Sequence, residues 1–396
     1  MAFFFGYLTD FGVWAVQGIT CNTYWQQWII CLIGILLVSV GVSLEVKAGV
    51  VVLAGEGVVL AVCKVLPKVK FGYMKVGFDV TLVVIACISY ASEQGMEAWG
   101  YDEDGWPSGF AGGEVQKAEP DTVITWIECR PCSEIQKDEE LLTTFPGDKK
   151  AGDSGMMMVV LCKNPGYVDL LNPETTEQFI KLTHNKYKTG LPEKEFGLLG
   201  GFFTDEPQYK REKIPYSTII EEEFEKEYGY SLRENLPALF RDFSGFTKVR
   251  YDYYRLVSRL FKENFTKKLY LWHRENSLGF TGHFLHEESL LRQMQGTAGV
   301  MPHYEYMTMP GMDWLGRSIG SPIVPKQVSS VAAQTGKKQV LSETFALCGW
   351  NVSFEELKWM AHWQFVNGVT MICQHLESYT LRGSRKRDYP PSLFYQ

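Results

Sequence analysis

The chain has 396 residues, a formal net charge of -7 and 21% charged side chains. Its length allows a large core and more than one domain, whereas the acidic balance argues against a general nucleic-acid-binding protein, which would need a clustered basic face. The nine cysteines are odd in number and scattered, so they predict no disulfide framework.

The first 92 residues differ in kind from the rest of the chain. Residues 24–44 carry no charge over a length that matches the ~20 residues needed to cross a bilayer. Further apolar runs lie at 3–21, 48–63 and 76–91. We therefore expect residues 1–92 to form an all-α, multi-pass transmembrane region in contact with the lipid bilayer. The alternative is a buried helical hairpin in a soluble protein.

Short segments of this region resemble the YczE-like group of bacterial multi-spanning membrane proteins. They are residues 10–12 (DFG), 41–46 (GVSLEV) and 78–81 (FDVT). The resemblance covers about the first 90 residues and implies a helical membrane fold without an established activity.

Beyond residue 92, strand-like segments repeatedly end in polar side chains. Residues 201–204 (GFFT) are typical of a buried strand, and the strand stops at Asp205 and Glu206. The carboxyl ends of parallel strands carry chemistry because the loops that follow them converge on one face, although Asp205 could instead cap a helix. The same pattern recurs at Trp99 with Asp102 and Glu103, at 279–286 with Glu287, at 299–303 with Glu305, at 339–342 with Glu343, and at 369–374 with His375 and Glu377.

Helical segments alternate with these strands. Asn172 is a predicted helix cap, and Ser353 with Glu356 forms a capping box. Helices are expected at 221–228, 247–276 and 354–366. Repetition of strand, polar end and helix predicts parallel βαβ units. The expected fold class is α/β: an incomplete (β/α)8 TIM-type barrel over 93–396 with a small β insertion at about 115–155, preceded by the all-α transmembrane region.

The junction between the two regions lacks a first barrel strand. Counting the strand at Trp99 as the second, the third to eighth are expected at Met156, Gly201, Thr281, Gly299, Gln339 and Thr370. Residues 81–90 are expected to be a helix rather than a replacement strand. The barrel is therefore predicted to be seven-stranded and incompletely closed, and the family resemblance of the motifs given next implies that it is cut at both ends.

Several motifs resemble the TIM-barrel glycoside hydrolases similar to α-L-rhamnosidases, over roughly residues 93–396. In chain order they are residues 101–113 (YDEDGWPSGFAGG), 203–207 (FTDEP), 342–345 (SETF) and 385–391 (RKRDYPP). In such barrels the ends of strands four and seven hold the general acid and the nucleophile or base. The resemblance therefore implies that Glu206 is the acid and Glu343 the nucleophile or base.

The remaining candidates are polar or aromatic side chains that could bind a sugar: Asp102, Glu103, Trp106, Asp205, Glu287, His303, Tyr304, Glu305, His375 and Glu377. Their carboxylates could hold sugar hydroxyls or calcium, whereas the histidines lack zinc-type spacing. No other metal or cofactor is expected. The expected function is hydrolysis of O-glycosyl bonds in a carbohydrate. The alternative is a membrane-anchored carbohydrate-binding protein or a catalytically inert fusion.

Overall fold

In the computed structural model the described residues are 71–148, 152–153 and 155–375, with single positions nearer the N-terminus: Thr23, Trp25, Gln26, Trp28, Ile29, Leu32, Ile33, Leu36 and Val65. Contacts divide the chain into two units, Met1–Val84 and Ile85–Gln396. The strands and the candidate site lie in the second unit. The motif at 385–391 lies outside the described residues.

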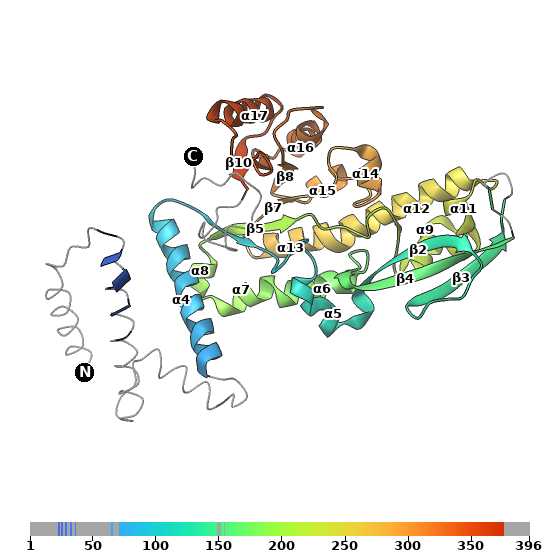
Figure 1. Ribbon diagram of the computed structural model, residues 1–396, viewed down its shortest axis with the longest axis horizontal. Helices are drawn as coiled ribbons and strands as arrows, with labels where there is room; N and C mark the ends of the chain where they lie inside the picture. Colours follow the sequence, from blue (N-terminus) through green and yellow to red (C-terminus); the bar gives the residue numbers. More distant parts are fainter. Residues whose placement is uncertain are drawn as a thin grey trace. The chain divides into compact units, whose positions relative to one another are not determined.

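Helices and short strands alternate along the second unit (Figure 1). The strands are β1 (Ala98–Tyr101), β2 (Val123–Pro131), β3 (Glu139–Pro146), β4 (Met156–Val168), β5 (Leu199–Asp205), β6 (Ile214–Tyr216), β7 (Gly279–His283), β8 (Met309–Trp314), β9 (Leu341–Thr344) and β10 (Met371–Gln374). The α-helices are α4 (Phe71–Glu93), α5 (Glu114–Ala118), α6 (Pro173–Leu182), α7 (His184–Gly190), α8 (Glu193–Phe196), α9 (Ile220–Tyr228), α10 (Leu232–Asn235), α11 (Pro237–Phe240), α12 (Phe246–Phe261), α13 (Lys267–Glu275), α14 (Leu290–Met294), α15 (Met301–Tyr304), α16 (Ile323–Gln334) and α17 (Phe354–Val366). Short 3-10 turns lie at Ala111–Gly113 and Pro120–Thr122, and a π-turn at Lys262–Thr266 joins α12 to α13.

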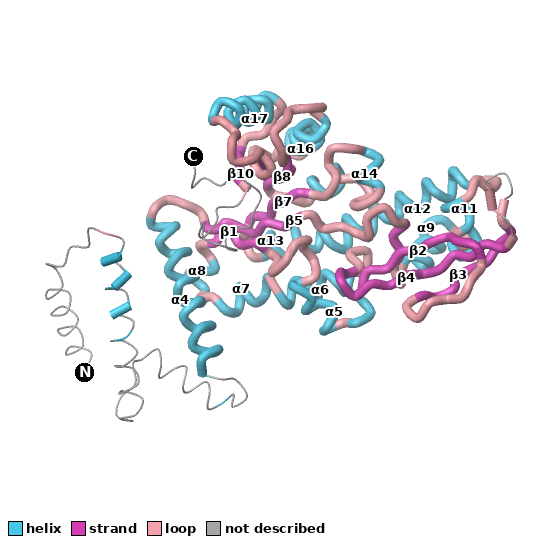
Figure 2. The backbone as a smooth tube through the Cα atoms, viewed as in Figure 1, coloured by secondary structure: helices cyan, strands magenta, loops and turns pink. Residues whose placement is uncertain are grey.

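Six strands form a parallel sheet in the order β1-β5-β7-β8-β9-β10 (Figure 2). β1 pairs directly with β5, and among the described residues no strand joins the outer edges of β1 and β10. The sheet is thus a half-barrel, and the predicted seven-stranded barrel is wrong. At the carboxyl ends Asp205 lies opposite His283, and Asp313 lies opposite Glu343.

The predicted third barrel strand belongs to a second sheet instead. β4 is a central strand of a four-stranded antiparallel sheet with the order β3-β4-β2-β6. Its alternate side chains are buried on both faces, Met157 and Val159 in the main core and Met158 and Val160 in a smaller cluster. An apolar run buried on both faces is also typical of a parallel strand, which is why the sequence predicted a barrel strand here. The predicted small insertion is accordingly a full sheet.

The predicted sixth strand is also wrong. Most of residues 299–303 falls on the short helix α15. The strand that pairs next to β7 is β8, further along the chain. Pro310 and Gly311 argue against a strand in the sequence. Gly311 is nevertheless required there, because a Cβ atom at this position would lie 2.5 Å from the carbonyl oxygen of Gly282 on β7.

The helices around the parallel sheet follow local sequence signals closely. The Asn172 side chain accepts a hydrogen bond from the Glu174 amide and caps α6. Ser353 and Glu356 form the predicted capping box of α17. α12 and α13 follow each other across the π-turn and cover the predicted helical range 247–276 (Figure 1). These helix predictions are confirmed.

The helix predicted over 81–90 is confirmed, since it lies within α4. The predicted span at 24–44 lies largely outside the described residues. Across the part of the chain that is described, no helix combines the length and the apolar character needed to cross a bilayer. The 23 residues of α4 include Lys75, Asp79 and Glu93. This finding overturns the predicted all-α transmembrane region and the predicted multi-pass membrane location, and it gives no support to contact with lipid.

Candidate active site

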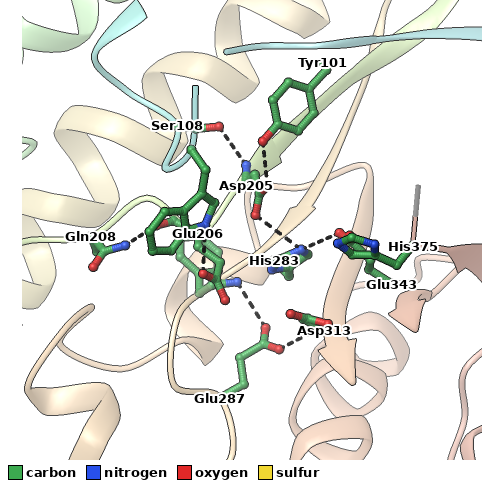
Figure 3. Close-up of polar contacts among 12 residues, drawn as sticks. Tyr101, Ser108, Asp205, Glu206, Gln208, His283, Glu287, Asp313, Glu343 and His375 are labelled. Atoms are coloured by element: carbon green, nitrogen blue, oxygen red, sulfur yellow. Dashed lines mark hydrogen bonds and ion pairs between the residues drawn. The ribbon is translucent and has the colours of Figure 1, made fainter. Parts of the chain in front are cut away.

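The carboxyl ends of the parallel strands surround a cavity of about 440 Å³. Strands β1, β5, β7, β8, β9 and β10, or the residues directly after them, all contribute side chains (Figure 3). The cavity is lined by Tyr101, Trp106, Asp205, Glu206, His283, Asp313, Leu315, Glu343, Leu347 and His375. This convergence follows from the parallel topology, which brings every strand end to one edge of the sheet.

The end of β5 places two acids in this cavity. The Asp205 carboxylate accepts a hydrogen bond of 2.6 Å from the Tyr101 hydroxyl, and the Asp205 amide donates to Ser108 Oγ at 2.8 Å. The Glu206 amide donates to the carbonyl oxygen of His283 on β7 at 3.2 Å. Glu206 has a φ of +45°, in the left-handed region that non-glycine residues rarely adopt. Such backbone outliers cluster at functional sites.

His283 lies between two carboxylates. Its Nε2 is 2.8 Å from Glu343 Oε2 and 3.6 Å from Asp205 Oδ1, and its side chain is 1% exposed. Burial lowers the pKa of His283, but the hydrogen bond with Glu343 and the charges of Asp313 and Asp205 outweigh burial and raise it well above its ordinary value. The imidazole is therefore biased towards its protonated form, which supplies a positive charge within the cavity.

The pKa values of the two predicted catalytic carboxyls move in opposite directions. Burial raises the pKa of Glu206, more than His283, Trp106 and Arg211 lower it. Burial also acts to raise the pKa of Glu343, but the hydrogen bond and the charge of His283 dominate and lower it. One carboxyl is thus biased towards its protonated form and the other towards its ionised form.

Trp106 provides the aromatic surface of the cavity. The ring is 50% exposed, and its Nε1 donates to Glu206 Oε2 at 3.0 Å. The Arg211 guanidinium lies 4.9 Å from the ring centroid. The exposed indole thus offers a ligand an apolar face, while its N–H holds the Glu206 carboxyl in place.

Glu287 supports the cavity from below. It is 3% exposed and accepts hydrogen bonds from the Phe284 amide, the Tyr304 hydroxyl and the Asp313 amide at 3.2, 2.5 and 2.9 Å. Burial raises the pKa of Glu287 to about 7. Through the Asp313 amide, Glu287 fixes the carboxyl end of β8 (Figure 3).

Three of these side chains could hold a cation. Ligand atoms of Glu206, His283 and Asp313 lie within 4.8 Å of one another. Nδ1 of His283 and Oδ1 of Asp313 are buried atoms without a hydrogen-bond partner. A cation bound by them would need a neutral imidazole and ionised carboxyls, so it would exclude the protonated form of His283.

The structure brings part of the predicted substrate-binding set together. Trp106, Asp205 and His375 line the cavity, along with the predicted catalytic pair. Asp102 is 1% exposed and accepts a hydrogen bond from Ser108. Glu103 accepts hydrogen bonds from six backbone amides of its own loop, those of Asp104, Gly105, Gly109, Phe110, Ala111 and Gly112. These two acids shape the loop that carries Trp106.

The candidates around α15 lie elsewhere. His303 is buried against Phe261 and Phe284, and its Nδ1 is 2.7 Å from the Thr266 hydroxyl. Tyr304 is buried and contacts only the supporting Glu287 among the acids of the site. Glu305 is exposed at the end of α15. The predicted residue Glu377 lies outside the described residues.

Sequence reasoning missed three residues of the cavity: Tyr101, His283 and Asp313. Each ends a strand of the parallel sheet, or nearly so. His283 was hidden because the strand was expected to continue to residue 286. Asp313 was not recognised because Pro310 and Gly311 argue against a strand at the position of β8. A search for polar residues at the end of every possible strand would have found all three.

Comparisons with known proteins give partial likenesses. A family described as "Family of unknown function (DUF6198)" matches residues 1–100, so the YczE-like resemblance of this region stays a prediction. A search of the curated proteins gives no match. Among solved structures, a rhamnosidase from Novosphingobium sp. PP1Y is similar, with 18% sequence identity and a TM-score of 0.44. The likeness covers 57% of this chain, and this chain spans only 24% of the length of that rhamnosidase.

Proposed function

We propose that the chain is a glycoside hydrolase that cleaves O-glycosyl bonds, with Glu206 as general acid and Glu343 as nucleophile or general base. One observation carries this proposal: the two carboxyls line the same cavity, and their pKa values are shifted in opposite directions. Glycoside cleavage needs one protonated and one ionised carboxyl group on either side of the scissile bond. Environments that push two carboxyl pKa values apart are how such pairs divide their roles.

The chemistry follows from these protonation states. Glu206 would give its proton to the glycosidic oxygen, so that the leaving sugar departs as a neutral alcohol. Glu343 would attack the anomeric carbon or take a proton from the attacking water. His283 holds Glu343 ionised through its hydrogen bond, and Trp106 holds the Glu206 carboxyl at the cavity wall.

The test is hydrolysis of aryl glycosides by the full chain. 4-Nitrophenyl α-L-rhamnopyranoside comes first, because residues 101–113 and 203–207 resemble motifs of α-L-rhamnosidase-like enzymes; a panel of other aryl glycosides follows. Glu343→Gln should lower kcat roughly 100- to 10,000-fold on every substrate. Glu206→Gln should do so on alkyl glycosides but much less on 4-nitrophenyl glycosides, whose leaving group hardly needs a proton.

The matched control is Glu305→Gln, an exposed acid at the end of α15, which should leave kcat unchanged. The dependence of kcat/KM on pH is a second readout. Activity should rise as Glu343 ionises and fall as Glu206 loses its proton at higher pH, and Glu206→Gln should remove the fall. Hydrolysis that survives both substitutions would refute the assignment. Sugar binding without hydrolysis would favour the alternative of a carbohydrate-binding protein.

A further inference from the structure

A second cavity of about 340 Å³ shares Trp106 with the candidate active site. Its walls come from the loops after β1 and β5 and from the antiparallel sheet, which contributes Ile124 and Asn164. A cavity of this size falls within the range of about 300 to 1,000 Å³ that is usual for small-molecule sites. A ligand that passes Trp106 would therefore occupy both cavities.

The second cavity carries positive charge. Lys210 and Arg211 line it, and the residues that line it include no Asp or Glu. In the described ranges, no carboxylate lies within salt-bridge distance of either cation. Arg211 is exposed, and its Nε donates to Gln208 Oε1 at 2.5 Å, which leaves its terminal N–H groups available for an anion.

Gln208 links Arg211 to the backbone of Glu206. Its side-chain amide donates to the carbonyl oxygen of Glu206 at 3.2 Å (Figure 3). Its side-chain oxygen accepts from Arg211 Nε. Gln208 is 5% exposed, so both contacts are held within a packed environment. Arg211 thus has a defined place beside Glu206 rather than a free surface position.

Aromatic side chains also contribute to the wall. Trp106, Phe110 and Tyr167 line the cavity, and the Phe110 and Tyr167 rings meet edge to face at 5.5 Å. Aromatic rings beside cations match a ligand that has an apolar sugar face and a charged substituent.

A third cavity, of about 290 Å³, is lined by Glu206 together with the acids Glu287, Glu288 and Asp313. The residues that line it include no Lys or Arg, whereas Lys210 and Arg211 line the second cavity. An anionic ligand therefore finds basic partners in the second cavity and none in the third.

We propose that the cavity of Lys210 and Arg211 binds the leaving-group sugar, and that this sugar carries an anionic substituent, either a carboxylate as in a uronic acid or a sulfate ester. The inference rests on the proposed function, because the general acid must contact the leaving oxygen and Trp106 joins Glu206 to this cavity. The substrate class is then an acidic oligosaccharide or polysaccharide cleaved next to a charged residue.

Binding to the full chain tests this inference without any turnover. The probes are methyl β-D-glucuronide, methyl β-D-glucoside 6-sulfate and the neutral methyl β-D-glucoside, titrated by ligand-observed NMR. At least one anionic probe should bind about tenfold more tightly than the neutral one, the factor expected for a charge-assisted hydrogen bond. Added salt should reduce this preference. Comparison of the two anionic probes identifies the substituent.

Variants assign the preference to the cavity. Lys210→Ala and Arg211→Ala should each reduce the preference for the anion, and Arg211→Lys should retain part of it. Lys213→Ala is the matched control, because Lys213 lies nearby in sequence, pairs with Glu128 at 2.7 Å and does not line the cavity. If Arg211→Ala does not fold, as judged by circular dichroism, Arg211→Gln takes its place.

Equal binding of charged and neutral probes, no binding of either, or a preference that survives Lys210→Ala combined with Arg211→Ala would overturn the inference. Hydrolysis of aryl glycosides without any anion preference would leave the proposed function intact and remove only this inference. Anion preference without hydrolysis of any glycoside would instead count against the proposed function.

Discussion

The acids of the antiparallel sheet and those of the candidate active site differ in their charged partners and in the direction in which their pKa values are shifted. In the sheet, Arg130 forms two hydrogen bonds with Glu139, at 2.7 and 2.5 Å, and Lys213 lies 2.7 Å from Glu128. The hydrogen bond from Arg130 is the main cause that lowers the pKa of Glu139 to about 2. The pKa of each of these acids is lowered, and each acid is paired with a basic side chain.

At the carboxyl ends of the parallel strands, acids gather without such partners. Burial is the main cause that raises the pKa of Asp205 and of Glu206, and it raises that of Asp313 well above its ordinary range. The charge of His283 lowers the pKa of all three acids, while His375 also acts on Asp205 and Arg211 on Glu206, but burial outweighs these charges. Perturbed carboxyls in a cavity are typical of functional sites, so this difference agrees with the proposed role of the second group of acids in binding and cleaving a ligand.

The largest effect is expected from a substitution that removes the positive charge of His283 from the cavity. In His283→Gln, Glu343 keeps a hydrogen-bond donor but loses the positive charge of His283, so burial outweighs the remaining charge of His375 and the pKa of Glu343 rises. Roughly 100-fold loss of kcat/KM is expected at pH 5, with recovery as the pH rises. The pH profile is the measurement, and an acid limb that stays in place would show that His283 does not set the ionisation of Glu343.

The next effect concerns stability. Glu287→Ala removes the acceptor of three donors, those of Phe284, Tyr304 and Asp313, and should lower the free energy of unfolding by about 3 kcal/mol. Urea denaturation measures this loss. A change of only a few tenths of a kcal/mol would mean that water replaces the carboxylate.

The pKa of Glu287 also predicts the sign of a pH effect. Its folded-state pKa of about 7 lies above the ordinary value of about 4.3, so the folded chain holds a proton that the unfolded chain has lost in between. The contribution of Glu287 to stability is therefore greatest at low pH and falls as pH rises through about 7. Glu287→Gln should remove this dependence, as seen by comparing urea midpoints at pH 5 and pH 8.

A smaller effect is expected in the loop that carries Trp106. Glu103→Ala leaves six backbone amides of this loop without their shared acceptor, but the loop is partly exposed and water can replace it. We expect a loss of about 2 kcal/mol in stability and a rise in KM, because Trp106 loses its fixed position. Exposed Glu119 provides the control variant Glu119→Ala. An unchanged KM would place Trp106 outside substrate binding.

The smallest effect is expected in the antiparallel sheet. Arg130→Ala breaks the pair with Glu139 and should lower the urea midpoint slightly while kcat/KM stays unchanged. Because the pKa of Glu139 is depressed to about 2, the contribution of the pair is present above the ordinary pKa and is lost as the pH falls towards about 2. Denaturation of both forms at pH 7 and pH 3 should therefore show their difference shrinking in acid. Loss of activity in this variant would contradict the separation of the two regions.

Local signals in the sequence predicted much of the fold. The cap at Asn172 and the capping box of Ser353 and Glu356 depend only on nearby residues, so they could be recognised directly. The strand at 201–204 and its acids were recognised for the same reason. Strand partners depend on distant residues instead. The apolar run at Met156 would suit either sheet, so its pairing with β2 could not be predicted from the run itself. Pro310 argues against a strand, although contacts with neighbouring strands make residues 309–314 one.

The candidate site divides in the same way. Glu206 and Glu343 were named because they end obvious strands and because their motifs resemble those of a known family. The charge on His283 follows from two carboxylates brought together by β5 and β9, and no pattern within one segment contains that information. The role of Glu103 as the acceptor for a whole loop was likewise invisible before the loop was seen to fold around it.

The left-handed backbone of Glu206 has a consequence for directed evolution. A φ of +45° costs a residue with a side chain about 1 kcal/mol or more, and glycine or asparagine adopts it more easily. A library screened only for heat resistance should therefore enrich Gly or Asn at position 206 and discard the carboxyl group. A library screened for turnover should keep Glu and accept the strain, so the residue that survives at this position records which selection was applied.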